Sequence, residues 1–292
     1  MRKKHREALQ GICYVLPSFA LILIFSIIPI FMNAYLSFTK FNIMQPAQWV
    51  GLDNYRRMLA DPYVAAALKN TAVFTLITVP VQTVLSLVLG AVLAELFRGR
   101  FGNFVKSSLF VPVIASAVLV GTLWSIILSP TGAANELITA MGGQPVNWLG
   151  GKNTALLSVC IATIWKNVGY FLVIYFAGIM DIPRSHYEAA QVDGANAIQR
   201  FFRITLPALA PVTFLVVTLG TIWSFQVFDM VQVMTGGGPG LSTVTLVLTI
   251  YNTAFKEYNM GYASAVALLM FAFVMLISGG QKLLLRGGKE RD

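Results

Sequence analysis

Six long apolar runs alternate with shorter polar stretches along this 292-residue chain. Each run is near or above the ~20 residues that an α-helix needs to cross a hydrocarbon layer of ~30 Å. The pattern therefore predicts six membrane-spanning helices, at 12–36, 71–97, 107–128, 155–180, 208–234 and 263–285. Between them, 37–70 is long enough to carry its own structure, with a turn-like stretch at Val50–Tyr55 and a helix start at Asp61-Pro62.

The first run follows a basic start, as a signal peptide does. It is longer than the 7–15-residue apolar region of such a peptide, and no A-x-A-like cleavage site follows it. We interpret it as a retained span.

Composition agrees with an integral membrane protein. Hydrophobic residues make up 57% of the chain and charged residues 11%, against about 25% charged in a soluble domain. Cys13 and Cys160 lie inside apolar runs, which indicates neither a disulfide framework nor a metal site. The net charge of +9 comes without dense basic tracts beyond the first residues, so a membrane-surface role is favoured over nucleic-acid binding.

The distribution of Lys and Arg predicts the orientation. If the N-terminus is cytoplasmic, fourteen of the 21 basic residues fall on the inner side and six on the outer side, with Lys166 inside a span. The positive-inside rule then favours cytoplasmic termini, 1–11 and 286–292, around a membrane domain at 12–285. The same assignment places the charged loop 181–207 in the cytoplasm.

The stretch from Ser185 to Pro207 is the most polar insert between two spans. Ser185 and Glu188 have the spacing of a capping box, which predicts a helix that begins near His186. Gly194 is suited to end that helix, because a residue without Cβ adopts the left-handed conformation at little cost.

A second start signal follows in the same loop. Asn196 with Gln199 can cap a new helix, and Pro207 can open the next span, where its missing N–H is not needed. The loop therefore consists of two short helices with a bend. It is either a docking element at the membrane face or an amphipathic connection between two spans.

Four elements at fixed separations in this loop resemble a known motif: Glu188-Ala189-Ala190, then Gly194, then Ile204-Thr205-Leu206-Pro207. They look like the cytoplasmic EAA motif of permease subunits of binding-protein-dependent ABC importers. The resemblance implies a type I importer fold and a coupling helix that sits in a cleft of an ATPase subunit. The residues that it marks for coupling are Glu188, Ala189, Ala190, Asp193 and Gly194.

Two outer stretches, VGLDNYRRM from Val50 and TGGGPGLSTVTLVLTIYNTAF from Thr235, are similar to the carbohydrate branch of these importers, of the maltose or glycerol-phosphate type. The Gly-rich stretch lacks a following Lys-Ser or Lys-Thr, and no G-x-x-x-x-G-K-[ST] occurs in the chain, so it is interpreted as a turn and not as a phosphate cradle. The resemblance implies a multi-pass protein of a prokaryotic cell membrane, working with a second permease, two ATPase subunits and an external binding protein. ATP and Mg²⁺ would be bound by those partners, with no cofactor in this chain.

Polar residues inside spans need a partner or a purpose, because an ionisable group at membrane depth costs about 2.5–3.5 kcal/mol even on the lenient insertion scale. Thr163, Lys166, Asn167 and Tyr170 have spacings i, i+3, i+4 and i+7, which places them on one helical face. The fifth run adds polar groups among aromatic residues. These are Ser224, Gln226, Asp229 and Gln232, with Trp223, Phe225 and Phe228 among them.

Planar hydrogen-bonding groups beside aromatic faces suit a sugar. The resemblance to maltose-type permeases also implies a sugar site on the fourth and fifth spans. The candidate substrate-binding residues are Thr163, Lys166, Asn167, Tyr170, Ser224, Gln226 and Asp229. Lys166 and Asp229 could instead form an ion pair between helices that fixes their packing.

Three hypotheses follow for function. The first is a permease subunit of an ATP-driven carbohydrate importer, and the second is a permease for glycerol-phosphate or another anion. The third is an ion-driven secondary transporter or channel, which would place coupling carboxylates near the midplane and show repeated halves. An intramembrane enzyme is disfavoured, because no Ser/His/Asp, HExxH or metal-ligand cluster is visible.

Overall fold

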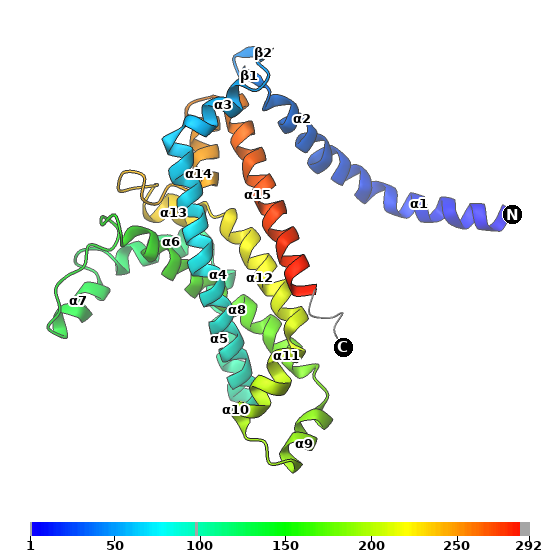
Figure 1. Ribbon diagram of the computed structural model, residues 1–292, viewed down its shortest axis with the longest axis vertical. Helices are drawn as coiled ribbons and strands as arrows, with labels where there is room; N and C mark the ends of the chain where they lie inside the picture. The colour runs from blue at the N-terminus through cyan, green and yellow to red at the C-terminus, as the bar shows by residue number, and fades with distance from the viewer. Residues whose placement is uncertain (1, 97–98, 287–292) are drawn as a thin grey trace. The chain divides into compact units, whose positions relative to one another are not determined.

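The computed structural model describes residues 2–96 and 99–286. It divides into two compact units, one formed by the chain up to Asp61 with Ile250–Leu269, the other by Pro62–Thr249 with the residues from Met270 onward. Figure 1 shows that both are built mainly of long helices. Beyond Arg286, the predicted cytoplasmic C-terminus lies outside the described residues.

The first unit contains an apolar helix and a small outer-loop structure. Its elements are α1 (Arg2–Ile22), the π-helical turn η1 (Leu23–Ile27), α2 (Ile28–Leu36), β1 (Thr39–Asn42), β2 (Gln45–Trp49), α3 (Asp53–Ala60), η3 (Asn252–Lys256) and the first part of α15 (Met260–Arg286). The two strands pair antiparallel as a hairpin, which the sequence pattern did not predict. The helix start predicted at Asp61-Pro62 is confirmed, because Pro62 is the first residue of α4. The helix α3 begins at Asp53, inside the stretch expected to be turn-like, and was not predicted.

Polar side chains hold this small structure together. The Asn54 side chain donates to the backbone oxygens of Ser37 and Thr39, both at 2.8 Å, and the hydroxyls of Tyr55 and Ser37 lie 2.7 Å apart. A Cβ at Gly261 would collide with the carbonyl of Thr39. This close approach of the two backbones holds the hairpin of β1 and β2 against the start of α15.

A second cluster in the same unit surrounds a buried tyrosine. The Tyr262 hydroxyl donates to the Asp61 carboxylate at 2.7 Å, and the Arg57 guanidinium carbon lies 4.3 Å from the centre of the Tyr262 ring. Such a contact of a cation with a ring face is attractive. It explains why the stretch from Val50 carries Arg57 at this place.

The second unit is a helical bundle. Its elements are α4 (Pro62–Leu96), α5 (Arg100–Ile114), α6 (Ala117–Ile127), α7 (Ala133–Ala140), α8 (Ala155–Met180), α9 (Arg184–Val192), α10 (Ala197–Arg200), the π-helical turn η2 (Phe201–Thr205), α11 (Leu206–Ala208), α12 (Ala210–Phe225) and α13 (Asp229–Met234); α14 (Leu246–Tyr251) lies mostly in it. The stretch 155–180 predicted for the fourth span coincides with α8.

Contacts between these helices define their relative directions. Ser86 of α4 donates to the carbonyl of Val168 at 2.9 Å, and a Cβ at Gly90 would lie 3.3 Å from the Tyr175 Cβ. The residue numbers of the contacting positions increase in the same direction along both helices, so α4 and α8 are parallel. Small residues at such crossings let helices approach closely, as is common in membrane bundles.

The helices α5 and α12 run in the opposite direction to α4 and α8. A Cβ at Gly169 of α8 would collide with the backbone of Leu109, while the ammonium of Lys106 lies 3.8 Å from the ring centre of Phe176. On α12, the hydroxyl of Ser224 lies 3.0 Å from that of Thr78. The ends of α4 and α8 and the start of α5 therefore lie together, and α9–α11 continue from that end.

The turn rich in glycine is a compact loop, as predicted. Gly236, Gly237 and Gly240 have positive φ values, and the Thr243 hydroxyl donates to the carbonyl of Gly238 at 2.8 Å. Asn70 of α4 donates its side-chain N–H groups to this loop at 2.7 and 3.0 Å. The loop is thereby tied to the bundle.

Two predicted spans are not single straight helices. Within 107–128 the chain bends by 98° between α5 and α6, and a second bend of 67° separates 197–208 from α12. Among the residues that the structure describes, four helices are long and apolar enough to cross a membrane, or up to six if each bent pair is one span. The fifth run is interrupted again at residues 226–228, before α13.

The break in the third run has a local cause. Ser116 is extended and its hydroxyl accepts from the N–H of Leu119 at 3.2 Å, so it caps α6. Capping satisfies a backbone donor that hydrocarbon could not. A serine in an apolar run thus marks the interruption that hydrophobicity alone does not reveal.

Replacement of Gly169 by Ala should destabilise the second unit, because the new Cβ meets the backbone of Leu109 and not a movable side chain. Overpacking of this kind costs roughly 1–3 kcal/mol. We expect a lower melting temperature of the detergent-solubilised protein and less folded protein in the membrane. Gly279→Ala is the matched control, since a Cβ at that position has nothing within 4 Å of it. Equal melting temperatures for the two variants would contradict this account of the α5–α8 contact.

Candidate functional site

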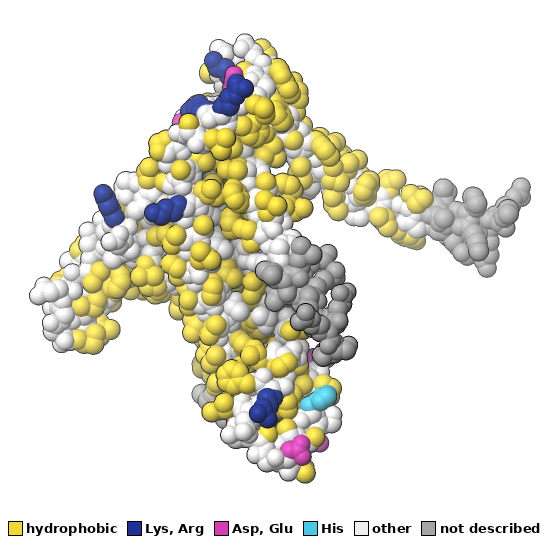
Figure 2. Space-filling model, viewed as in Figure 1, with side chains coloured by type: hydrophobic (Ala, Val, Ile, Leu, Met, Phe, Trp, Pro, Cys, Tyr) yellow, Lys and Arg dark blue, Asp and Glu magenta, His cyan; other side chains and the backbone are white. Residues whose placement is uncertain are grey.

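The residues that the sequence marked for coupling lie on and just after α9. Glu188 and Ala189 are exposed, whereas Tyr187 and Ala190 are partly buried. Val192, on the outward side, is 88% exposed. The helix therefore turns one face to the bundle and presents a largely open face that carries Glu188. Figure 2 shows basic, acidic and histidine side chains gathered around this end of the second unit.

The capping box predicted at the start of α9 is wrong. The helix begins at Arg184 and follows Pro183, with no side-chain cap. Ser185 is already inside the first turn, so its hydroxyl is not placed to cap that turn as the capping box required. Pro183 has an extended ψ of 131°, and this fixed backbone sets the start instead.

The predicted end of α9 is confirmed. Gly194 has a φ of 77°, its N–H donates to the carbonyl of Gln191 at 3.0 Å, and the N–H of Ala195 donates to that of Ala190 at 2.8 Å. This pair of bonds is the Schellman arrangement, which satisfies the last carbonyls of a helix. Asp193 is the exposed C-cap residue before it.

The second half of the loop also starts as predicted. The Asn196 side chain accepts from the N–H of Gln199, and the Gln199 side chain accepts from the N–H of Asn196, both at 2.9 Å. The chain then passes through η2 into α11, where Pro207 occupies an early position that needs no N–H donor. The bend before α12 falls at Leu209, which is completely buried.

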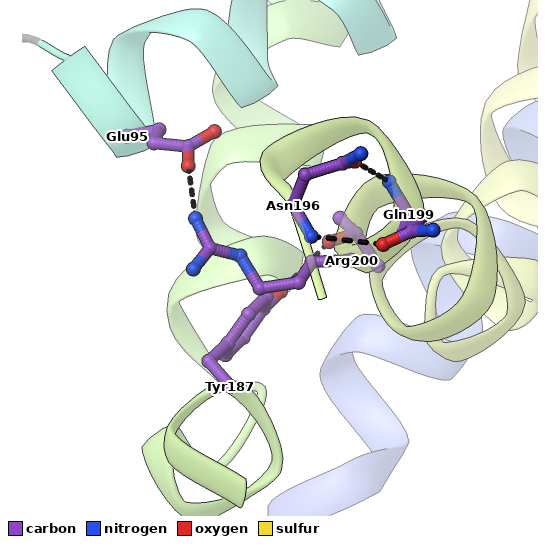
Figure 3. A network of polar contacts seen from close by, with 6 residues as sticks. Glu95, Tyr187, Asn196, Gln199 and Arg200 are labelled. Carbon is purple, nitrogen blue, oxygen red and sulfur yellow. Dashed lines mark hydrogen bonds and ion pairs between the residues drawn. The ribbon is translucent and has the colours of Figure 1, made fainter. Parts of the chain in front are cut away.

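One contact joins the two halves of the loop, and a second, drawn in Figure 3 between Arg200 and Glu95, attaches the loop to the bundle. The Tyr187 hydroxyl lies 2.9 Å from that of Thr205, and Arg200 donates to the Glu95 carboxylate of α4 at 2.9 Å. All four residues line a groove of about 390 Å³. A second hollow of about 540 Å³ lies on the side of His186 and Arg203.

Two of the four residues of the polar stripe on α8 have hydrogen-bond partners within the protein. Thr163 is 9% exposed and donates to the carbonyl of Val159 in its own helix at 2.8 Å. Lys166 donates to the carbonyl of Val113, near the end of α5, at 3.3 Å. Asn167 is partly buried beside it.

The candidates on the fifth run fall on both sides of the second break. Ser224 is 5% exposed and contacts Thr78, so its hydroxyl joins α12 to α4. Gln226 is the exposed C-cap residue of α12 and Asp229 is the exposed first residue of α13. Across the parts of the chain that can be described, no direct ion pair joins Asp229 to Lys166.

Aromatic rings lie among these polar candidates on α8 and α12. The ring centres of Tyr170 and Trp223 lie 4.9 Å apart, and each ring also contacts Phe171. Trp223 is 37% exposed, yet sequence reasoning did not place it among the substrate-binding candidates. The signal was its position next to Ser224, since an indole beside hydrogen-bonding groups is typical of a sugar-binding surface.

Over residues 2–96 and 99–286, no group of three or more His, Cys, Asp or Glu side chains has the geometry to hold a metal ion. The candidate site has three parts: the exposed helix α9, the groove behind it, and the polar and aromatic surface on α8 and α12.

Comparison with known proteins gives the family. The family described as "Binding-protein-dependent transport system inner membrane component" matches residues 6–287. The chain belongs to this family. Its members are transport permeases.

Relatives of this permease cover nearly all of it. It is 36% identical over 272 residues to the probable ABC transporter permease protein YurN of Bacillus subtilis, with 92% of this chain and 93% of the relative covered. It is 33% identical over 278 residues to the trehalose/maltose transport system permease protein MalF of Thermococcus litoralis, with 94% and 92% covered.

The fold also matches a solved structure. A chain in the crystal structure of a bacterial ABC transporter involved in the import of the acidic polysaccharide alginate superposes with a TM-score of 0.86. The match covers 97% of both chains at 23% sequence identity. The permease therefore has the fold of an ABC importer permease.

Removal of the Asn196 cap in this permease should loosen the second half of the loop. Loss of an N-cap costs about 0.5–2 kcal/mol, so Asn196→Ala should speed amide hydrogen exchange over residues 198–202. Asn196→Asp retains the acceptor that Gln199 uses and serves as the control. Mass-spectrometric exchange on the membrane-inserted protein measures both. Unchanged exchange in the Ala variant would mean that the capping box does not hold this segment.

Proposed function

We propose that this chain is the membrane-spanning subunit of an ATP-driven importer for a carbohydrate, and that it forms half of the translocation pathway. In this proposal each bent helix pair counts as one span, which gives six spans with both termini in the cytoplasm. The observation that carries the proposal is α9. It is an exposed helix with Glu188 and Ala189 outward, held at its end by Gly194 and placed where α4 and α8 both finish.

The coupling role follows from how α9 is presented. Its outward face offers a carboxylate, small side chains and the apolar Val192, which suits insertion into a cleft of an ATPase subunit. Ala189 leaves little bulk on this face, so the partner can approach the helix backbone. The Schellman end at Gly194 fixes the length of the helix, and the capped second helix holds its position.

Transport would proceed by alternating access. Closure of two ATPase subunits on ATP moves α9 with them, and the bundle changes from an inward-open to an outward-open state. A ligand shifts such an equilibrium only by its different affinity for the two states. Hydrolysis would take place in the partner subunits, which bind ATP and Mg²⁺, because this chain contains no phosphate-binding loop.

The carbohydrate assignment draws on the polar and aromatic surface of α8 and α12. Tyr170 and Trp223 offer ring faces to the C–H side of a sugar, while Asn167 and Lys166 offer donors to its hydroxyls. The named function of the relative from Thermococcus litoralis, trehalose/maltose transport, points the same way. A companion permease would supply the facing half, and an external binding protein would deliver the solute.

A second candidate substrate is an anionic solute such as glycerol-phosphate. The observation in its favour is Lys166, whose ammonium contacts a backbone carbonyl and forms no direct ion pair in the described part of the chain. A cation that is not neutralised by contact could bind a phosphate or carboxylate. Asp229 weakens this case, because it is an acidic residue available to neutralise the Lys166 ammonium.

Glu188→Lys and Gly194→Leu should each abolish coupling without loss of membrane insertion. The first reverses the charge on the docking face, and the second forces a side chain into a left-handed conformation that costs roughly 1–2 kcal/mol. We expect ATP-dependent uptake to fall at least tenfold and copurification of the ATPase to weaken. Glu136→Lys, on the exposed face of α7, is the matched charge control. Wild-type uptake by both loop variants would count decisively against the docking role.

Trp223→Ala should raise the KM for the transported sugar with a smaller effect on kcat. A single aromatic contact contributes about 0.5–1.5 kcal/mol, which corresponds to a roughly two- to tenfold rise. Leu123→Ala, an exposed apolar residue of α6, is the control. Competition of uptake by neutral oligosaccharides or by phosphate esters then distinguishes the two substrate classes. An unchanged KM would remove Trp223 from the pathway.

A further inference from the structure

The helix α9 has few side-chain attachments to the bundle. Over the described parts of the chain, the hydrogen bond of Tyr187 with Thr205 is the one side-chain hydrogen bond that joins α9 to another element. Thr205 is 5% exposed and belongs to η2. Any movement imposed on α9 is therefore passed first to the second half of the loop, both through the chain and through this pair of hydroxyls.

The second half of the loop has a direct contact to α4. The Arg200 side chain is only 16% exposed, and it donates to a carboxylate oxygen of Glu95, whose side chain is 52% exposed. Glu95 lies one residue before the end of α4. A charge-assisted hydrogen bond of 2.9 Å has a defined geometry and is stronger than a neutral one.

The covalent route from the loop into the membrane contains a joint. Residues 197–208 and α12 meet at an angle of 67° around Leu209. A bend between short segments can absorb motion before it reaches α12. The contact of Arg200 with Glu95 bypasses this joint and ends on α4, which also contacts α8 through Ser86 and α12 through Thr78.

Both contacts line the same groove of about 390 Å³ behind α9. Figure 3 shows Tyr187 and Arg200 close to one another on the side of Glu95. Small residues such as Ala91 and Ala94 of α4 form part of the groove, so side chains do not fill the space between α9 and the bundle. The polar contacts across the groove, and not close packing, then set the distance between α9 and α4.

We propose that the pairs Tyr187–Thr205 and Arg200–Glu95 form a brace that makes α9, η2 and the end of α4 move as one body. Motion of the coupling helix is thereby delivered to α4 as well as to α12. The four are positioning residues, separate from the exposed set that faces the ATPase. This inference rests on the proposed coupling function.

Spin labels test the brace without any transport assay. Labels at Ser185→Cys, an exposed residue of α9 outside the set that faces the ATPase, and at Val92→Cys on α4, with Cys13 and Cys160 replaced, report the distance between the two helices in the assembled complex. With an intact brace, the distance distribution should remain the same with and without ATP. In Arg200→Gln the distribution should broaden and shift with nucleotide. A shift with ATP in the protein that retains all four brace residues would overturn the proposal.

The transport consequence is measured as solute taken up per ATP hydrolysed in proteoliposomes. Arg200→Gln, Glu95→Gln and Tyr187→Phe should each lower this ratio at least threefold while copurification of the ATPase is kept. The exchange Glu95→Arg with Arg200→Glu should restore most of it. A pair with one half-exposed partner adds little to global stability, so these variants should fold.

Arg56→Gln is the matched control, because it breaks an exposed ion pair with Asp53 in the first unit. It should leave the ratio unchanged. A wild-type ratio in all three brace variants, or a charge exchange no better than the single variants, would overturn the brace. Absence of ATP-dependent uptake in the wild-type complex would instead refute the proposed function, and the distance measurement would still decide on the brace.

Discussion

Hydrocarbon offers no hydrogen-bond partner to the backbone, and the second unit depends on this constraint. Long helices satisfy it internally. Where the third apolar run breaks, the Ser116 hydroxyl accepts from a free N–H of α6 and the Lys166 ammonium donates to a free carbonyl of α5. The break is therefore a built feature of the bundle with its own polar partners. Lys166 therefore has a structural role at the end of α5, in addition to any contact with a solute.

The same constraint favours close approach of helices at small residues. Gly169 lets α8 meet the backbone of α5, and Gly90 lets α4 meet α8. Without a hydrophobic driving force between helices in lipid, such packing and a few interhelical hydrogen bonds supply the specificity. The result is close packing of α4 and α5 against α8, with α12 joined to α4 through Ser224 and Thr78.

The proposed cytoplasmic element, α9 to α11, is stabilised by interactions of another kind. Its helices are short, exposed and polar, so they rely on caps and on two polar contacts instead of burial. Gly194 and Asn196 define where one helix stops and the next begins. A short helix held in this way can present Glu188 to a partner and still be displaced as a unit. The exposed apolar helix at Gly11–Leu36, none of which is buried within this chain, is suited to lipid or to a companion subunit.

The local features of this protein were readable from the sequence. Periodicity and run length located α8 to the residue, and glycine and asparagine chemistry located the end of α9 and the start of α10. These depend on interactions within a few residues, which a single sequence displays. The prediction for the start of α9 is wrong, because the helix begins directly after Pro183 and Ser185 lies inside its first turn.

The tertiary structure alone decided which distant residues meet. Arg200 and Glu95 are far apart in sequence, and nothing in either local pattern indicates the other. The same holds for Lys166, whose predicted alternative partner was Asp229 but whose hydrogen bond goes to a carbonyl released by the bend in another helix. Apolar runs specify that helices form in lipid. The places where those helices bend and touch follow from backbone hydrogen bonds and side-chain volumes that only the packed bundle brings together.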